Sequence, residues 1–172
     1  MEEKVILVDE QDHEVGVMDK LEAHQKGLLH RAFSIFVFNS KGELLLQQRA
    51  DEKYHSAGLW TNTCCSHPRK GEKMEDSVSR RLKEEMGMSC QTGFKFSFIY
   101  KMLFENGLTE HEFDHVFFGV SDEEPRLNPL EVKDYRYIGL EKLRKDVESH
   151  PQKYSAWLQI CLPRVTEYFN KI

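Results

Sequence analysis

The sequence GLWTNTCCSHP, residues 58–68, is followed by EKMEDSVSRRLKEEMGM, residues 72–88, and these two stretches decide how the chain folds. Apolar residues occupy every fourth position of the second stretch, namely Met74, Val78, Leu82 and Met86. This period is typical of a helix with one apolar face. Gly87 follows directly, where a glycine commonly ends a helix. We therefore expect a helix over residues 74–86 that buries one face.

The helix phase separates two neighbouring acids. At about 100° per residue, Glu85 falls roughly 20° from Val78, at the edge of the apolar stripe. Arg81 lies one turn earlier on the same edge, whereas Glu84 and Arg80 point away from it. An inward acid is costly to bury unless a cation meets it. Glu85 and Arg81 are therefore expected in a functional site, and Glu84 and Arg80 on the surface.

A known motif resembles this region. The loop–helix–loop of a Nudix box, which holds divalent metal against a diphosphate, is matched by Glu72, Arg80, Leu82, Glu84, Glu85, Gly87 and Met88. Ser66 stands where the box usually opens with Gly, and Arg81 stands where Nudix hydrolases usually carry a metal-binding Glu. The second departure also occurs in the type 1 isopentenyl-diphosphate isomerases. The cysteine motif of that branch is matched by Asn62, Cys65, His67 and Pro68. The resemblance extends from Lys20 through Trp157.

Bulk composition narrows the class of protein. A chain of 172 residues suffices for one domain with a real core, so we expect a single domain over residues 1–172. The net charge of −5 disfavours a nucleic-acid partner. The sequence shows neither a signal peptide nor an apolar run long enough to cross a membrane. Four cysteines, two of them adjacent, suggest neither a disulfide framework nor a zinc site, so we expect the reducing cytoplasm. No pattern indicates an oligomeric state.

Strand and helix patterns alternate along the chain. Strands are expected at residues 5–9, 14–18, 31–38, 43–48, 94–104, 109–120 and 134–138. Further helices are expected at residues 19–26, 140–148 and 155–170, the last with Trp157, Ile160, Val165 and Phe169 facing inward. This order predicts an α/β domain. The resemblance implies a Nudix-like mixed β-sheet layered between helices.

The resemblance also implies a metal cage. The residues that match the family's ligands in order are His24, His30, His67, Glu110 and Glu112, with His24 and His30 one residue closer than in the family. Glu110, Glu112 and Asp114 share one face of their strand by its period of two. Imidazoles and carboxylates suit Mn²⁺, Zn²⁺ or Mg²⁺, six-coordinate if one carboxylate binds through both oxygens. A single histidine in such a sequence is more often a surface or core residue than a ligand.

Cys65 and Glu112 match the acid–base pair of the family. Moving the double bond of isopentenyl diphosphate requires a proton at the terminal alkene carbon and removal of another from C2, through a tertiary carbocation. Either residue could protonate the alkene. In an extended segment, neighbouring side chains point to opposite sides, so Cys65 and His67 would share a side, and Cys64 would face the core or the opposite wall. Composition alone would make Cys65 a small buried apolar residue.

The remaining site residues follow from the same resemblance. Trp157 and Tyr100 match the aromatic residues beside the carbocation, where an indole face attracts a cation. The candidate diphosphate clamp is Lys20, Arg49, Lys53 and Arg81, with Mg²⁺ bridging Glu85 and the diphosphate. Without the resemblance, scattered basic residues would usually be solvated surface residues, and aromatic residues would usually belong to the core.

These observations favour an isopentenyl-diphosphate Δ-isomerase, whose partner is a small prenyl diphosphate. One alternative is a Nudix pyrophosphohydrolase acting on a nucleotide, although Arg81 removes one of the helix acids that such an enzyme needs. The other is a catalytically silent Nudix-like module that binds a diphosphate or a protein. A pure binder has no use for the thiol of Cys65, which argues against this second alternative.

Overall fold

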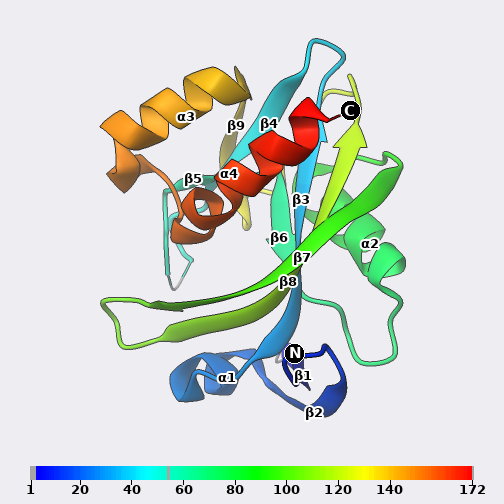
Figure 1. Cartoon of the computed structure of the whole chain (residues 1–172), viewed down its shortest axis with the longest axis vertical. Coiled ribbons are helices and arrows are strands. Elements are labelled where there is room, and N and C mark those ends of the chain that lie inside the picture. The colour runs from blue at the N-terminus through cyan, green and yellow to red at the C-terminus, as the bar shows by residue number, and fades with distance from the viewer. Residues whose placement is uncertain (1–2, 54, 172) are drawn as a thin grey trace.

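The fold is a mixed β-sheet with helices on both of its faces (Figure 1). The computed structural model describes residues 3–53 and 55–171. Its strands are β1 (Lys4–Val8), β2 (Glu14–Asp19), β3 (His30–Phe38), β4 (Glu43–Arg49), β5 (Trp60–Thr61), β6 (Cys64–Ser66), β7 (Thr92–Leu103), β8 (Thr109–Val120) and β9 (Val132–Gly139). Its helices are α1 (Lys20–Lys26), α2 (Met74–Met86), α3 (Leu140–Ser149), the 3-10 turn η1 (Pro151–Lys153) and α4 (Ala156–Asn170). Each expected strand and helix is therefore confirmed, and β5, β6 and η1 are additions.

Strand β3 lies at the centre of the sheet. It pairs in parallel with β8 along its whole length, with His30 opposite Glu112 and Phe38 opposite Val120. On its other edge it pairs with β6, where Ser34 lies opposite Cys65. Strand β7 extends the sheet beyond β8, and β4 pairs with β9 and β5. The two strands that carry Cys65 and Glu112 therefore flank the same central strand.

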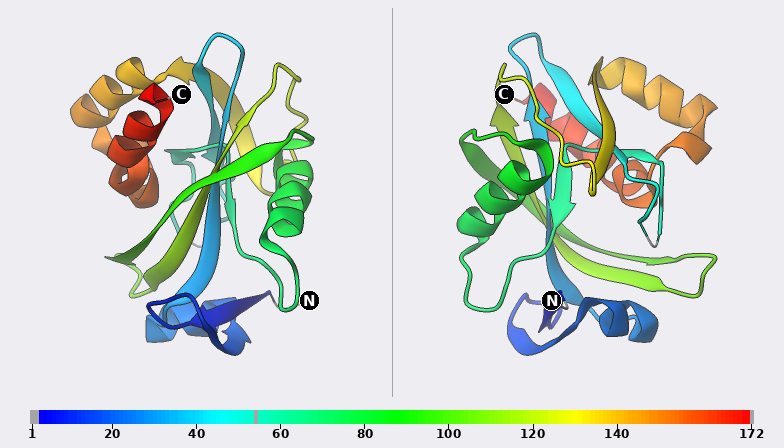
Figure 2. Two further views of the ribbon diagram at one scale, coloured as in Figure 1. Left: turned by 45° about the vertical axis from the view of Figure 1, so that its right-hand side comes forward. Right: turned by 180° about the vertical axis from the view of Figure 1, so that it is seen from behind.

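Alternate residues of β3 supply the two cores. Phe36 and Phe38 face a cluster that also includes Leu158 of α4, and Ile35 and Val37 face a cluster that includes Val78 of α2. This follows from the period of two in a strand. Figure 2 shows α2 on one face of the sheet and α3 with α4 on the other. Because both faces are covered, β3 is apolar at every position from Ile35 to Phe38.

Helix α2 has the expected phase. Val78, Leu82 and Met86 are at most 1 % exposed, and Glu85 beside them is only 5 % exposed. The helix ends at Gly87 in the left-handed conformation, φ 62°, and the Gly87 N–H donates to the carbonyl of Lys83. The pattern of apolar residues therefore predicted both the inward acid and the end of the helix.

Helix α4 corrects one expectation. Trp157 and Val165 are buried as predicted, and Phe169 packs against the same core, but Ile160 is 40 % exposed. The buried residues of the helix are Trp157, Leu158, Cys161, Leu162 and Val165. At 100° per residue, Ile160 lies about 130° from the centre of this arc, so its side chain points outward. Among the described helices, none has the length and apolarity that crossing a membrane requires.

We expect Gly87→Ala to destabilise the protein more than Gly71→Ala. Both glycines have positive φ, 62° and 79°, where an L-residue costs about 1–2 kcal/mol. A Cβ at Gly87 would in addition lie 2.5 Å from the backbone oxygen of Arg126, whereas a Cβ at Gly71 meets nothing within 4 Å. Urea unfolding of both variants measures the difference. Equal losses of unfolding free energy would show that the contact with Arg126 carries no cost.

Candidate active site

One cleft gathers all but one of the residues singled out from the sequence. Its walls include Lys20, His24, Arg49, Lys53, Cys65, His67, Arg81, Glu85, Tyr100, Glu110, Glu112 and Trp157. His30, the remaining candidate, is fully buried, with its ring centroid 5.1 Å from that of His67. Segments from all parts of the chain therefore meet at one place.

Strand β6 turns its two thiols to opposite sides. Cys65 faces the cleft, where its thiol donates to Oδ1 of Asn62 at 3.0 Å and accepts from Nε1 of Trp157 at 3.1 Å. Asn62 is held in turn, because its Nδ2 donates to the carbonyl of Ile35 at 3.0 Å. Burial raises the pKa of the Cys65 thiol well above its usual range, and the nearby carboxylate of Asp114 adds to this. The thiol is therefore protonated.

Cys64 lies in the core against α2, as the alternation of side chains predicted. Its thiol is fully buried and donates to Oε2 of Glu85 at 2.8 Å. Oε1 of Glu85 accepts from the guanidinium of Arg81 at 3.0 Å. The inward acid thus has the cationic partner that its burial requires. The contact with Cys64 was not foreseen from the sequence, which suggested only a small apolar residue there.

Three acids of β8 share one buried face. Glu110, Glu112 and Asp114 are at most 7 % exposed. The hydroxyl of Tyr100 contacts both glutamates and donates to Oε1 of Glu112 at 2.6 Å. Ser34 donates to Asp114 at 2.7 Å. Burial and the neighbouring charge of Glu112 raise the pKa of Glu110, because two adjacent carboxylates cannot easily both be ionised away from water.

The charge of Glu112 is favoured by its neighbours. Burial alone would raise its pKa, but hydrogen bonds with Glu110 and His67 hold the pKa of Glu112 well below its usual range. Nε2 of His67 lies 3.4 Å from Oε2 of Glu112. The same contact, together with Glu3, raises the pKa of His67 against the effect of its burial. Glu112 is therefore an ionised acceptor in this environment.

The histidines of the predicted cage present the same ring nitrogen to its centre. Nδ1 of His24 lies 2.7 Å from the carbonyl of Lys20, and Nδ1 of His30 lies 2.9 Å from the carbonyl of Leu28. These carbonyls fix the tautomer in which Nε2 is free of its proton, the form that binds metals. Burial lowers the pKa of His30 to about 4 and also lowers the pKa of His24, so both rings are neutral near pH 7.

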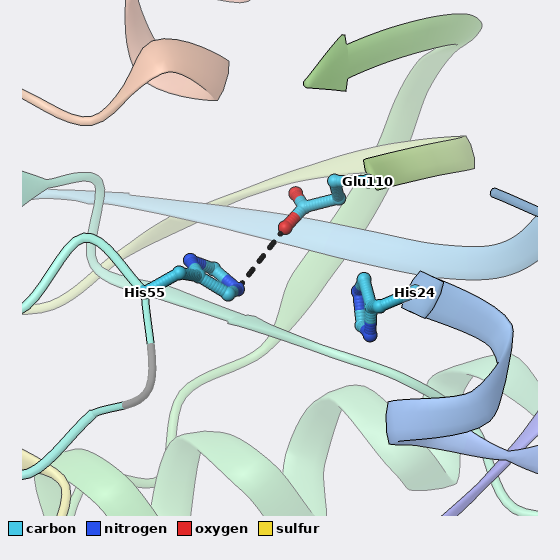
Figure 3. Close-up of side chains that lie close together, drawn as sticks. All are labelled: His24, His55 and Glu110. Carbon is cyan, nitrogen blue, oxygen red and sulfur yellow. Dashed lines mark ion pairs between the residues drawn. The ribbon is translucent and has the colours of Figure 1, made fainter. Parts of the chain in front are cut away.

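The donor atoms fall into two neighbouring groups, each of which could hold a metal ion. One consists of His30, His67 and Glu112, and the other of His24, Glu110 and His55, with the ligand atoms of each group within 4.8 Å of one another. Figure 3 shows His55 and His24 directed toward Glu110. His55 was missed from the sequence, where it reads as one polar residue of a charged loop without periodicity. Its fixed position depends on contacts with distant segments.

This donor set fits a divalent cation. Nε2 of His30 is buried and has no hydrogen-bond partner among the residues described. The carboxylate of Glu112 belongs to the same group of possible ligands, and Glu110 is buried on the same face of β8. A mixture of imidazole nitrogens and carboxylate oxygens suits a borderline or hard divalent ion. Within each of the two groups, the ligand atoms are thus close enough to hold one ion together.

The four basic residues expected to bind diphosphate all line the cleft and have acidic or aromatic neighbours. Nζ of Lys20 lies 3.1 Å from Glu3, Lys53 pairs with Glu131, and Arg81 pairs with Glu85. The guanidinium carbon of Arg49 lies 5.1 Å from the centre of the Trp157 ring. The cleft is therefore basic along its rim and acidic at its base.

The two residues expected on the surface of α2 have structural partners. The side chain of Glu84 is 40 % exposed and accepts from Arg81 at 2.5 Å. Arg80 makes two hydrogen bonds to Glu72, at 2.7 and 3.0 Å, and so ties the loop before α2 to the helix. A bidentate pair of this kind is stronger than a single exposed ion pair. Arg80 is thus outside the cleft, as predicted, but fixes the local fold.

Comparison with known proteins finds a matching family model and similar proteins. The NUDIX domain family matches residues 28–158. The chain is 56 % identical over 165 residues to isopentenyl-diphosphate Delta-isomerase 2 of Aromatoleum aromaticum, covering 96 % of this chain and 87 % of that protein. It is 49 % identical to isopentenyl-diphosphate Delta-isomerase of Pectobacterium atrosepticum, covering 97 % and 93 % of the two chains.

Solved structures share the fold at lower sequence identity. The protein DR0079 of Deinococcus radiodurans superposes with a TM-score of 0.78 at 21 % identity, covering 94 % of this chain and 98 % of that one. A MutT protein from Methanosarcina mazei gives a TM-score of 0.67 at 20 % identity, covering 83 % and 94 %. These likenesses concern the arrangement of strands and helices.

We expect Mn²⁺ or Zn²⁺ to raise the melting temperature of chelator-treated protein. A ligand that binds only the folded state stabilises it by about 2.7 kcal/mol at a concentration 100 times its dissociation constant. His30→Gln should largely remove this gain, because it deletes a buried donor. His150→Gln should keep it, because His150 is exposed and pairs only with Asp146. The same metal-induced shift in both variants would show that His30 is not a ligand.

Proposed function

This chain belongs to the isopentenyl-diphosphate Delta-isomerases of the NUDIX domain family, and we propose that Cys65 and Glu112 are the acid–base pair of its reaction. The enzyme interconverts isopentenyl diphosphate and dimethylallyl diphosphate. The observation that supports the assignment is the approach of a protonated thiol and an ionised carboxylate to one cleft from opposite sides of β3. Both residues line the same cleft, so a thin hydrocarbon chain bound there would reach both groups.

The reaction needs one proton in and one proton out. One member of the pair delivers a proton to the terminal alkene carbon, and the π electrons form the new C–H bond. This leaves a tertiary carbocation at C3. The other member removes a proton from C2, and that electron pair becomes the new double bond. The reverse reaction exchanges the two roles. After one turnover the net charge of the pair is unchanged, but the proton has moved from one member to the other, and exchange with solvent restores the starting state.

Trp157 is suited to the cationic intermediate. It is 3 % exposed, and its indole N–H is already directed to Cys65. A cation over an indole face in a desolvated site gains about 2 kcal/mol or more. Tyr100 contributes differently, because its hydroxyl bonds both glutamates and so fixes the orientation of Glu112. These two residues would position the pair and exclude water that could trap the carbocation.

Lys20, Arg49, Lys53 and Arg81 would bind the diphosphate at the basic rim of the cleft. Arg81 presents a planar guanidinium that can make paired hydrogen bonds with phosphate oxygens. Glu85 would hold Mg²⁺ together with the diphosphate, as one carboxylate plus phosphate is a common arrangement for this ion. The helix position of Arg81, which hydrolases use for a further acid, supports isomerisation over hydrolysis of a nucleotide.

A divalent ion of Mn²⁺, Zn²⁺ or Mg²⁺ type, held by His24, His30, His67, Glu110 and Glu112, would supply positive charge that keeps both carboxylates ionised. The chain's own hydrogen bonds, from Tyr100 to Glu112 and from Nδ1 of His24 to the carbonyl of Lys20, hold these side chains in place. The four free thiols support a reducing compartment, and we place the reaction in the cytoplasm.

Incubation with isopentenyl diphosphate should yield dimethylallyl diphosphate, measured by NMR, with exchange of solvent deuterium into the product. Incubation with a nucleoside diphosphate in parallel should release no phosphate. Phosphate release without isomerisation would make the chain a hydrolase. Binding of isopentenyl diphosphate without turnover would make it a silent binding module.

The two adjacent thiols should differ sharply. Cys65→Ala should lose nearly all isomerase activity with the fold retained, because it removes a proton-transfer group from the cleft. Cys64→Ala should keep most activity, since Cys64 contacts only the core and Glu85. Rates are compared after circular dichroism has verified folding.

Glu112→Gln should also abolish turnover, whereas Glu84→Gln should retain it, because Glu84 lies outside the cleft. An epoxide at the alkene end of a substrate analogue should label Cys65 and spare Cys64. Labelling of Cys64, or an inactive Cys64→Ala variant, would show that Cys64, and not Cys65, points into the cleft.

A further inference from the structure

His55 lies at the edge of the metal-binding group although it is carried by the loop between β4 and β5. Its side chain is 7 % exposed, and its Nε2 lies 3.3 Å from Oε2 of Glu110. Its ring centroid is 6.0 Å from that of His24, comparable to the 6.4 Å between His24 and His67. His55 is thus about as near to His24 as His67 is, and it lies with His24 and Glu110 in one group of possible ligands (Figure 3).

The orientation of His55 repeats that of the other histidines. Its Nδ1 lies 3.2 Å from the hydroxyl of Ser56, which leaves Nε2 directed toward Glu110. In His24 and His30, Nδ1 is likewise next to an oxygen, from Lys20 and Leu28. An oxygen on the outer nitrogen is the usual environment of a metal-binding histidine, because it fixes the tautomer and the ring plane.

The ring is also fixed by packing. It stacks on Phe104 with centroids 4.7 Å apart and planes 10° from parallel. Trp157 meets it edge-on, with centroids 5.8 Å apart. These contacts fix the ring plane but make no demand on the chemistry of Nε2. A purely structural ring at this position could be phenylalanine, whereas the approach of Nε2 to Glu110 needs an imidazole.

We infer that His55 is a further protein ligand of the cage metal, acting beside His24 and Glu110. This inference rests on the proposed function, which places a divalent ion among the five residues named above. With those five alone, six-coordination requires one carboxylate to bind through both oxygens. With His55 as a sixth donor, each residue needs to supply only one atom.

The sixth donor has a consequence for Glu112. Its Oε2 lies toward His67, while its Oε1 accepts from Tyr100 at 2.6 Å. If His55 completes the coordination, Oε1 of Glu112 need not bind the metal and stays available for proton transfer. His55 also connects the cage to two residues of the diphosphate clamp. Lys53 lies on the same loop as His55, and Arg49, at the end of β4, donates to the carbonyl of His55 at 3.3 Å.

The test uses the full chain, stripped of metal and reloaded with Co²⁺ as the probe. His55→Phe keeps the aromatic packing on Phe104 and Trp157 but has no donor atom, and His55→Gln removes the ring. Affinity is measured by competition with a chelator, and coordination by the visible absorption of Co²⁺. Both variants should bind Co²⁺ at least tenfold more weakly. Losing only the hydrogen-bond partner of a ligand typically costs roughly 10- to 100-fold in affinity, and losing the ligand itself should cost no less. Their visible bands should also strengthen as the coordination number falls.

Two control variants distinguish a failure of the His55 assignment from a failure of the proposed metal cage. His150→Gln, on the exposed end of α3, should behave as wild type. His30→Gln should lose Co²⁺ affinity at least as strongly as the His55 variants. If His30→Gln loses affinity while His55→Phe keeps the wild-type affinity and spectrum, His55 is a packing residue and the inference is overturned. If His30→Gln itself binds Co²⁺ normally, the proposed cage fails and the inference fails with it.

Discussion

The parallel pairing of β3 with β8 is the constraint on which the rest of the site depends. It sets His30 opposite Glu112 and Ala32 opposite Asp114, while the other edge of β3 sets Ser34 opposite Cys65. A slip of one residue would turn every side chain of one strand to the other face. Such a slip would bury apolar side chains in the cleft and place carboxylates in the core. The packing of the two hydrophobic clusters therefore fixes the positions of Cys65 and Glu112.

The site concentrates like charge where water is scarce. Glu110, Glu112 and Asp114 face the same side of β8, and each has a specific partner within the protein. Buried carboxylates without such partners would cost several kcal/mol each. The sheet supplies the hydroxyl groups of Tyr100 and Ser34, and the cage is suited to supply a cation. Stability and chemistry therefore depend on the same few contacts.

Different sides of helix α2 carry the residues that pack in the core and the residues that line the cleft. Val78 and Leu82 on one face pack in the core. Arg81 and Glu85, at the edge of that face, pair with each other and line the cleft. Arg80, on the outer side, holds the preceding loop in place by its hydrogen bond to Glu72. Cys64 connects the core to this edge by its contact with Glu85. The helix can thus hold charged groups at the cleft because its apolar face fixes its rotation.

The sequence by itself determined the family, the order of strands and helices, the inward rotation of Glu85, and the opposite facing of Cys64 and Cys65. These properties depend on periodicity within one segment, which local geometry fixes at about 100° per residue in a helix and 180° in a strand. Only the tertiary structure placed His55 beside Glu110, joined Cys64 to Glu85 and turned Ile160 outward. A loop such as that carrying His55 has no period, so its side chains are positioned by Phe104 and Trp157, which lie far away in the chain. For Ile160, the pattern of α4 left several apolar arcs available, and the packing of the helix on the sheet selected one of them.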